Sequence, residues 1–179
     1  MSVSHDDPRL TGVSDPQTTN DLRTFLYLEA LALEERRFRD WLQFWAPEAT
    51  YQMPVRITRE AGAEWELAPK AHVFDDTKRS LEIRVERLET EFAWAEQPPS
   101  RTRRYVTNVL VFPGEQPEQY VVRSNVLIYR SRGDDPVPSL LSVQRRDTIV
   151  RDGDSWLITE RWGALDQSLV NAHNLSIFF

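Results

Sequence analysis

Side chains that could transfer protons are few and widely separated in this sequence. A general acid or base must lie within hydrogen-bond reach of its substrate, usually beside a group that orients it. No spacing in the chain forces any two candidates together, so acid–base catalysis has no supporting pattern. Asp40, between Arg39 and Trp41, is equally compatible with an exposed position on a helix. The candidates for such chemistry are Asp40, His72, Asp147, Glu160 and Asp166.

Motifs for metals, phosphates and nucleophiles are missing as well. The chain has no cysteine, which excludes thiolate catalysis, disulfides, Cys-zinc sites and cysteine ligation of iron–sulfur clusters. Its histidines, His5, His72 and His173, include no closely spaced pair of the kind that would support a non-haem iron site. No glycine lies in a phosphate-binding loop, and no Gly-x-Ser-x-Gly motif occurs. We therefore predict no catalytic, cofactor-binding or metal-binding residue in this chain.

Composition indicates one globular domain. A chain of 179 residues with 40% hydrophobic and 28% charged residues can form a single compact domain with a core. The net charge of -6 argues against general binding to nucleic acid, which requires a basic surface. The polar N-terminus resembles neither a signal peptide nor a membrane span, so we expect a cytoplasmic protein. Residues 1–17 are predicted to be a flexible arm, and residues 18–179 a single α+β cone domain.

Three segments have helical patterns. A helix from about residue 18 places an apolar stripe on one face, and a second short helix follows from Phe38 until Pro47 ends it. A third helix, capped by Asp75-Asp76-Thr77, runs to about residue 88. Its charged faces are compatible with either a solvated surface or a subunit contact. The stripe of the first helix consists of Leu22, Phe25, Leu26, Glu29/Ala30 and Leu33.

Five segments have strand patterns, and most of them follow the helices. Pro54 confines the first strand, residues 50–57, to an edge or a bulge, and residues 59–71 are predicted to be a loop. Residues 101–112, which follow two prolines, are predicted to form a strand whose second half, apolar on both faces, suits a central position. Its first half carries three arginines in four residues and is expected to emerge at an edge or an interface. The last strands are predicted at 119–129, 140–150 and 155–163, the final two as a hairpin.

Alternation within the last strand assigns its side chains to two faces. Trp156, Ile158 and Trp162 are expected on one face, and Leu157, Thr159 and Arg161 on the other. Helices followed by a run of long strands indicate an α+β fold with a curved antiparallel sheet packed against N-terminal helices, which gives a cone.

Several motifs resemble the small (beta) subunit of bacterial aromatic-ring-hydroxylating dioxygenases, in the branch acting on biphenyl, toluene, cumene and phenylpropionate. The resemblance covers nearly all of the chain after residue 20, and the run WAEQPPSRTR is its most diagnostic part. It implies a cone-like fold similar to nuclear transport factor 2 and scytalone dehydratase. The motifs are FRDWL at 38–42, FDDT at 74–77, RLETEFAWAEQPPSRTRRYVTNV at 87–109, LIYR at 127–130 and HNLSIFF at 173–179.

The resemblance also implies a division of labour between subunits. In that family the partner alpha subunit carries the Rieske [2Fe–2S] cluster, the mononuclear Fe(II) and the substrate pocket, within an alpha3beta3 hexamer. Electrons arrive from NADH through a reductase and usually a ferredoxin, and the product is a cis-dihydrodiol. The beta subunit is mainly structural and contacts alpha and other beta subunits. The alternative from the residues alone is a stand-alone cone-fold lyase or isomerase that uses a pocket Asp or His.

Two groups of residues are candidates for the subunit interface. Three arginines are expected to form ion pairs across a subunit boundary with one tryptophan as an apolar anchor, because interfaces favour both residue types. Pairing of the arginines within the chain, with Glu91 or Glu96, is the alternative. The apolar tip of the sequence is expected to pack under the sheet or against a neighbouring subunit. The residues are Trp94, Arg101, Arg103, Arg104, Ile177, Phe178 and Phe179.

Overall fold

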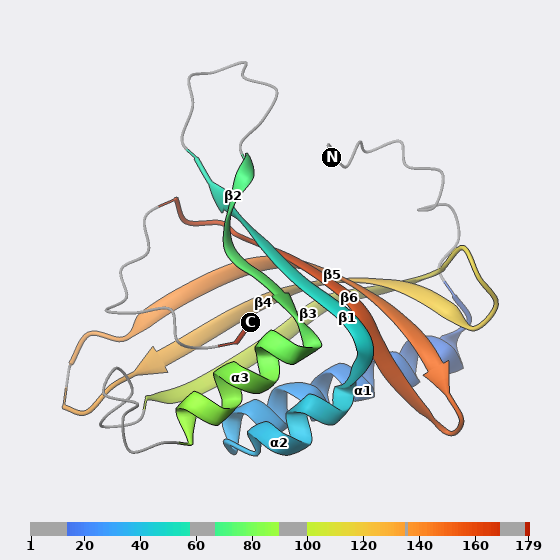
Figure 1. Cartoon of the computed structure of the whole chain (residues 1–179), viewed down its shortest axis with the longest axis horizontal. Helices are drawn as coiled ribbons and strands as arrows, with labels where there is room; N and C mark the ends of the chain where they lie inside the picture. The colour runs from blue at the N-terminus through green and yellow to red at the C-terminus, as the bar shows by residue number, and fades with distance from the viewer. Residues whose placement is uncertain (1–13, 58–66, 90–99, 135, 169–177) are drawn as a thin grey trace.

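A single six-stranded sheet curves around three α-helices in the computed structural model, which describes residues 14–57, 67–89, 100–134, 136–168 and 178–179 (Figure 1). The helical elements are α1 (Pro16–Glu34), α2 (Phe38–Trp41), the 3₁₀ helix η2 (Leu42–Phe44) and α3 (Lys78–Leu88). The strands are β1 (Trp45–Arg56), β2 (Leu67–Thr77), β3 (Arg101–Pro113), β4 (Gln119–Ser131), β5 (Ser139–Asp152) and β6 (Ser155–Leu165).

The strand order is β2-β1-β6-β5-β4-β3, so β2 and β3, which follow one another in the sequence, lie at opposite edges of the sheet. The β1–β6 pair is parallel, and every other neighbouring pair is antiparallel. The predicted α+β cone, with helices against one face of a curved sheet, is confirmed. The predicted β5–β6 hairpin is also present, with Gly153 at φ +59° in its turn, where a side chain would strain the backbone.

The helices begin where short polar side chains cap them. The Asp15 carboxylate accepts a hydrogen bond from the Thr18 main-chain N–H at 3.0 Å, and Pro16 occupies the first turn. Helix α1 therefore starts two residues before the predicted position. Thr77 and Ser80 form a capping box at the start of α3, whose buried residues, Leu81 and Val85, lie on the predicted apolar face.

Two predictions about the first strands were wrong in their boundaries. The second helix turns into 3₁₀ geometry at Leu42, and β1 already begins at Trp45, so Pro47 lies inside a strand. The segment from Leu67 onwards, predicted as the end of a loop, is strand β2, and Thr77 at the end of this strand caps α3 as predicted. This strand covers the side of β1 that was a possible edge, and Pro54 is instead accommodated at a register shift between β1 and β2.

Strand β3 lies at the edge of the sheet, so the central position predicted for its second half was wrong, whereas an edge position was one of the two expected for its first half. It pairs with β4 alone. Helix α1 packs against β3 and covers the apolar residues on one of its faces. Part of the other, outer face of β3 is exposed. A bulge at Asn108, with φ +54°, interrupts the alternation between Thr107 and Leu110.

A bulge in β6 changes which side chains enter the cone. Ile158 pairs with Ile149 and Glu160 pairs with Thr148, so Thr159 is an extra residue on β6. An extra residue reverses the side-chain alternation beyond it. Arg161 is therefore buried beside the core, whereas the sequence placed it on the face opposite Trp156 and Ile158; that assignment was wrong.

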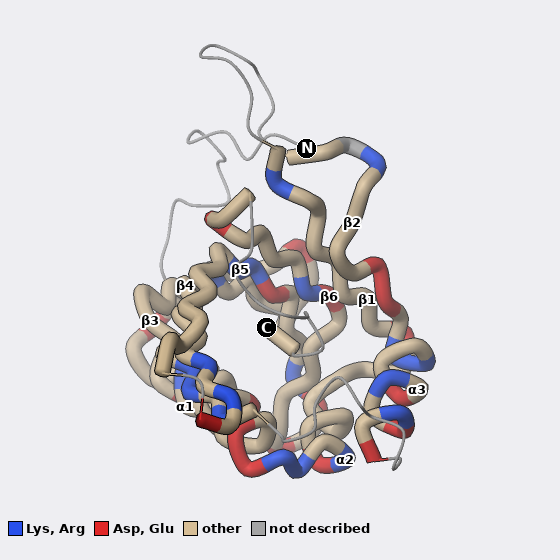
Figure 2. The backbone as a smooth tube through the Cα atoms, turned by 90° about the vertical axis from the view of Figure 1, so that its left-hand side faces the viewer, with Lys and Arg blue, Asp and Glu red and all other residues tan. Residues whose placement is uncertain are grey.

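The apolar core fills the space between the sheet and the helices. Figure 2 shows the last residues, marked C, inside the ring that the sheet and helices form. The largest fully buried side chains include one aromatic ring from α2, two from β1 and two from the end of the sequence. These are Trp41, Trp45, Tyr51, Phe178 and Phe179.

Candidate functional site

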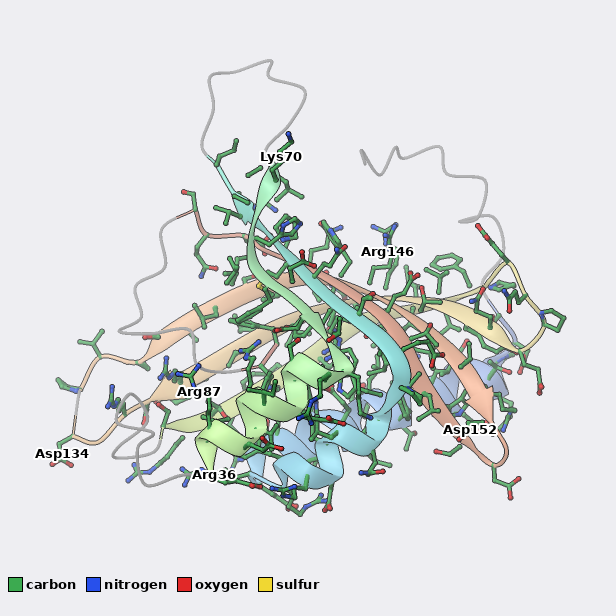
Figure 3. All side chains as sticks on the ribbon, in the orientation of Figure 1. Arg36, Lys70, Arg87, Asp134, Arg146 and Asp152 are labelled. Atoms are coloured by element: carbon green, nitrogen blue, oxygen red, sulfur yellow. The ribbon has the colours of Figure 1, made fainter. Side chains whose placement is uncertain are left out.

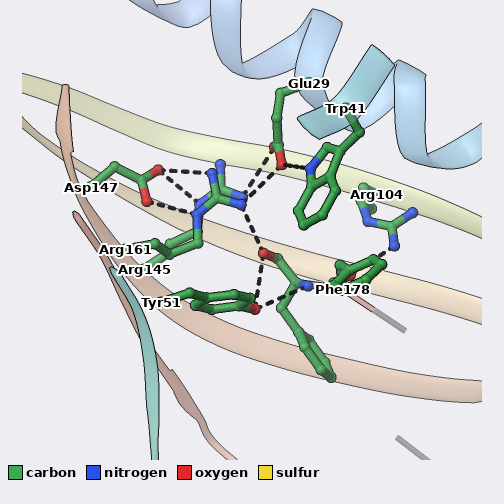
Figure 4. A network of polar contacts seen from close by, with 9 residues as sticks. Glu29, Trp41, Tyr51, Arg104, Arg145, Asp147, Arg161 and Phe178 are labelled. Atoms are coloured by element: carbon green, nitrogen blue, oxygen red, sulfur yellow. Dashed lines mark hydrogen bonds and ion pairs between the residues drawn. The ribbon is translucent and has the colours of Figure 1, made fainter. Parts of the chain in front are cut away.

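Four charged side chains are completely enclosed in the cone. Glu29 comes from α1, Arg145 and Asp147 from β5, and Arg161 from β6, and each is at most 2% exposed (Figure 4). Burying a charge is costly unless it is paired and hydrogen-bonded. This buried ion cluster is the most unusual chemical feature among the described residues.

Arg161 joins the two carboxylates of the cluster. Its Nε donates to Asp147 Oδ1 at 2.8 Å, and its Nη1 donates to Glu29 Oε1 at 2.9 Å. Arg145 contacts the same carboxylates less closely, with Nε 3.2 Å from Asp147 Oδ2 and Nη1 3.5 Å from Glu29 Oε2. The Trp41 indole N–H donates to Glu29 Oε1 at 2.6 Å. The cluster therefore links α1, α2, β5 and β6.

Burial and ion pairing act in opposite directions on the pKa of Glu29 and of Arg161. Burial by itself would raise the pKa of Glu29, but Arg161 and Arg145 lower it below its ordinary value. Burial likewise opposes the charge of Arg161, yet Asp147 and Glu29 raise its pKa above the usual value. For Arg145, burial and the neighbouring Arg161 lower the pKa. Each of the four charged groups is engaged with another member of the cluster, so the geometry supports a structural role and not acid–base catalysis.

The other acid–base candidates lie apart from this cluster. Asp40 is exposed and bonds to Arg37 at 2.8 Å, and Glu160 is exposed and accepts from Thr148 at 3.2 Å. Asp166 accepts from the Ser142 hydroxyl at 2.5 Å, and His72 is exposed on β2. No hydrogen bond or ion pair joins any two of the five described candidates, so the lyase alternative is not favoured.

The predicted interface arginines divide between the surface and the interior. Arg101 and Arg103 are exposed, and Arg103 Nη1 lies 2.9 Å from Glu34 Oε2 of the same chain. Arg104 is part-buried and donates from Nη2 to the Phe178 carbonyl at 2.7 Å. Glu34 was not among the expected intrachain partners. A contact of these arginines with another subunit stays a prediction.

The other predicted interface residues are the last two residues of the chain and two that the structure does not describe. Phe178 and Phe179 are buried beneath the sheet by this chain itself, which is one of the two arrangements expected for the tip. Trp94 and Ile177 lie outside the described residues. The structure therefore shows how the last two residues pack, and their role in a subunit interface stays a prediction.

The outer face of the sheet carries exposed apolar side chains side by side. Tyr105 on β3 pairs with Leu127 on β4, and Tyr129 on β4 pairs with Leu140 on β5. Tyr105 is 58% exposed and Leu140 is 53% exposed. Arg103 lies directly opposite Tyr129 across the β3–β4 pair. We call Tyr105, Leu127, Tyr129 and Leu140 the outer-face patch.

Sequence reasoning named Asp147 only as an acid–base candidate and assigned no charged role to Glu29, Arg145 or Arg161. Glu29 was placed on the apolar face of α1, and a carboxylate in that position was itself a signal of a buried charged partner. Arg145 and Asp147 lie in the same every-second-residue series as the apolar Leu141, Val143 and Ile149 of β5, which was a second signal. Arg161 gave no usable signal, because the β6 bulge that turns it inward has no sequence signature that we recognised.

Comparisons with known proteins agree with this architecture. The model for the family described as "Ring hydroxylating beta subunit" matches residues 28–172. The chain belongs to this family. It is 39% identical over 169 residues to 3-phenylpropionate/cinnamic acid dioxygenase subunit beta of Photorhabdus laumondii, with 92% of this chain and 93% of that protein covered.

Solved structures extend the likeness to the fold. A chain of naphthalene 1,2-dioxygenase, crystallised with indole in its active site, matches with a TM-score of 0.87 and 25% identity, covering 99% of this chain and 95% of that chain. A putative scytalone dehydratase of Novosphingobium aromaticivorans matches with a TM-score of 0.61 and 15% identity, covering 84% of this chain and 89% of that chain. The second match shows a shared fold only.

Membership of this beta subunit family assigns a structural role to the chain. In ring-hydroxylating dioxygenases, catalysis is carried by the alpha subunit. Within the described ranges, no three His, Asp or Glu side chains gather as metal ligands. The same part of the chain has no helix that is long and apolar enough to cross a membrane.

Proposed function

We propose that this beta subunit supports the assembly of the catalytic alpha subunits of a terminal oxygenase through its outer-face patch. The alpha partner is inferred from the family, and the contact surface is inferred from the exposed patch. Four large apolar side chains in adjacent register positions are unusual on an exposed sheet face, and such patches mark interaction sites. This exposed patch is the observation that carries the proposal.

The edge position of β3 strengthens this assignment. An exposed edge strand with apolar side chains promotes uncontrolled pairing unless something covers it or caps it. Glu34 of α1 caps part of this edge, because its carboxylate accepts from the Arg104 main-chain N–H at 2.5 Å. The outer face beside the capped edge is then free for a partner that buries Tyr105 and Leu127.

Charge around the patch indicates an acidic partner surface. Arg101 and Arg103 lie on the same face of β3 as Tyr105, at every second residue. Arg103 keeps a large exposed fraction even while it is paired with Glu34, so it retains donors for a second carboxylate. A basic and aromatic surface on a chain with net charge -6 favours a partner with carboxylates opposite these arginines.

The catalytic parts of the reaction then belong to the alpha partner. We propose an alpha3beta3 hexamer in the cytoplasm, in which alpha holds a Rieske [2Fe–2S] cluster and a mononuclear Fe(II). Electrons from NADH would arrive through a reductase and ferredoxin, and O₂ would be added to an aromatic compound to give a cis-dihydrodiol. The relative named for 3-phenylpropionate and cinnamic acid makes aryl-substituted short acids the first substrates to assay.

Assembly tests the role of the patch directly. The tagged beta chain is co-expressed with its alpha partner as wild type and as the double variant Leu127→Glu/Tyr129→Glu. Two carboxylates at the centre of the patch should lower the recovered alpha by at least about tenfold, because charge in an apolar interface core costs well over 1.4 kcal/mol. Native mass, iron content and the visible spectrum of the eluate are the readouts.

Control variants separate assembly from folding. Ser155→Glu adds a carboxylate at the β5–β6 turn, at the opposite end of the sheet from the β4–β5 loop that contains Asp134, and should leave assembly unchanged (Figure 3). Ile83→Glu on the exposed side of α3 decides whether that helix is a contact or a solvated surface. Full recovery of iron-containing complex with the folded double variant would contradict the proposed docking face.

Arginine contacts have a separate test. Arg103→Glu places like charges beside Glu34 and should weaken the complex further at low salt than at high salt, since exposed charge pairs are screened. The unfolding of the isolated chain measures the intrachain part of the effect. Equal losses in the isolated chain and in the complex would show that Arg103 acts only within its own chain.

A further inference from the structure

Phe178 and Phe179 are held in the cone as a ligand is held in a pocket. The Phe178 ring stacks on Trp41 with centroids 4.3 Å apart, and the Phe179 ring lies 5.7 Å from that of Phe74. The Arg84 guanidinium carbon is 4.2 Å from the Phe74 ring centroid and 4.6 Å from that of Phe178. The interior therefore contains two aromatic subsites with a cation beside them.

The main-chain polar atoms of Phe178 and Phe179 form hydrogen bonds with side chains of the cone. The Phe178 carbonyl accepts from Arg104 Nη2 at 2.7 Å, and the Phe179 main-chain oxygen accepts from Arg161 Nη1 at 3.0 Å. The Tyr51 hydroxyl accepts from the Phe179 N–H at 3.1 Å and donates to its oxygen at 3.3 Å. The donors of Arg104, Arg161 and Tyr51 are therefore arranged to bind oxygen acceptors that lie next to an aromatic ring.

The interior also has buried hydrogen-bond donors that have no partner among the described residues. Arg145 Nη2 and Arg104 Nε are buried and have no hydrogen-bond partner among the described residues. Burial lowers the pKa of Arg104 to about 10, so a nearby anion would relieve the cost of its charge.

We propose that the cone interior is a binding site for a small aromatic carboxylate, which Phe178 and Phe179 fill as an internal ligand. The aromatic ring would lie on Trp41, and the carboxylate would bind Arg104 and Arg161, as the two main-chain oxygens do. An uncharged arene would leave these donors unpaired. This site is independent of the proposed assembly role, since it lies on the opposite face of the sheet from the patch.

Removing the two rings tests the site in the full-length chain. The probe is N-acetyl-L-phenylalanine, which carries a ring, an amide and a carboxylate; its uncharged amide derivative is the matched control. By titration calorimetry, Phe178→Ala/Phe179→Ala should bind the acid at least about tenfold more tightly than wild type does, because the rings no longer compete. The amide derivative should bind the same variant at least about tenfold more weakly than the acid, since charge-assisted hydrogen bonds are lost.

A third substitution locates the binding. Adding Arg104→Gln removes the guanidinium that holds the Phe178 carbonyl and should reduce acid binding at least about tenfold while leaving amide binding unchanged. No binding to a folded double variant, or equal binding of acid and amide, would overturn the proposal. If the double variant does not fold alone, its refolding yield should rise with the acid and not with the amide. A yield that neither compound changes would also overturn it.

Discussion

Replacing Glu29 with glutamine removes one charge from the buried cluster and almost no volume. The side-chain carbonyl of the glutamine can still accept from the Trp41 indole, which lies 2.6 Å from the present carboxylate. The new amide N–H₂ would face the guanidinium groups of Arg161 and Arg145 in place of an oxygen. Two arginines would then share Asp147 as their remaining cluster carboxylate.

The expected cost follows from these contacts. Removing one partner of a buried ion pair destabilises a protein by about 3–5 kcal/mol, because the other charge is left uncompensated. Since the indole hydrogen bond survives, we expect the lower end, about 3 kcal/mol. A domain of this size loses about 2–4 °C of Tm per kcal/mol, so Tm should fall by about 6–12 °C.

Urea unfolding at pH 7, followed by circular dichroism at a fixed chain concentration, measures the free energy of unfolding directly. Glu82→Gln is the matched control, because Glu82 forms an exposed i,i+3 ion pair with Arg79 on α3. Such a surface pair contributes about 1 kcal/mol or less. The same chemical change should therefore have a large effect in the cone and a small effect on the helix surface.

The pH dependence of the stability difference between wild type and Glu29→Gln is the result that could refute this reasoning. The arginines hold the pKa of Glu29 below its ordinary value of 4.5, so its contribution is complete above that pH. The contribution is lost as the pH falls through the lower folded pKa. The stability difference between wild type and Glu29→Gln should therefore shrink below about pH 4.5. A difference under about 1 kcal/mol at pH 7, or one that stays constant in acid while both chains are folded, would refute the reasoning.

Two further predictions concern neighbouring polar contacts. Tyr51→Phe removes the hydroxyl that bonds to Phe179 and should cost about 1–2 kcal/mol in urea unfolding at pH 7. Burial raises the pKa of Tyr51 to about 12 from 10.0, so wild type should lose stability as the pH rises between these values, and Tyr51→Phe should lose less. Lys78→Met removes the ammonium that bonds two main-chain carbonyls where η2 meets β1 and should cost about 1–3 kcal/mol, whereas Lys70→Met at an exposed site should be neutral in thermal unfolding.

Local patterns were sufficient for the helices and for most strands. The apolar spacing of α1 and α3 and their polar caps depend on residues within a few positions of each other, so the sequence predicts them. The proline-rich stop before β3 and the glycine turn between β5 and β6 are equally local. Strand β2 was missed because its sequence has no clear alternation, and it forms only by pairing with β1.

For function too, the sequence was sufficient only where residue type and local order carry the inference. The absence of cysteine and of paired histidines, together with the run around residues 94–103, already indicated a beta subunit without its own cofactor site. Those are properties of residue type and order, which folding does not alter. The predicted partner surface rests on arginines whose exposure could not be known in advance. Arg103 remained at the surface, whereas Arg104, one residue later, points to the interior because successive side chains of a strand alternate.

Tertiary structure alone decided what the cone contains. Glu29, Arg145, Asp147 and Arg161 are up to 132 positions apart, and only the packing of α1 against the sheet brings them together. The extra residue at Thr159 turns Arg161 inward, which strict alternation along β6 excludes. Residue order determines a local conformation within a few positions, but a buried charge requires partners from distant strands and helices, and their positions exist only once the chain has folded.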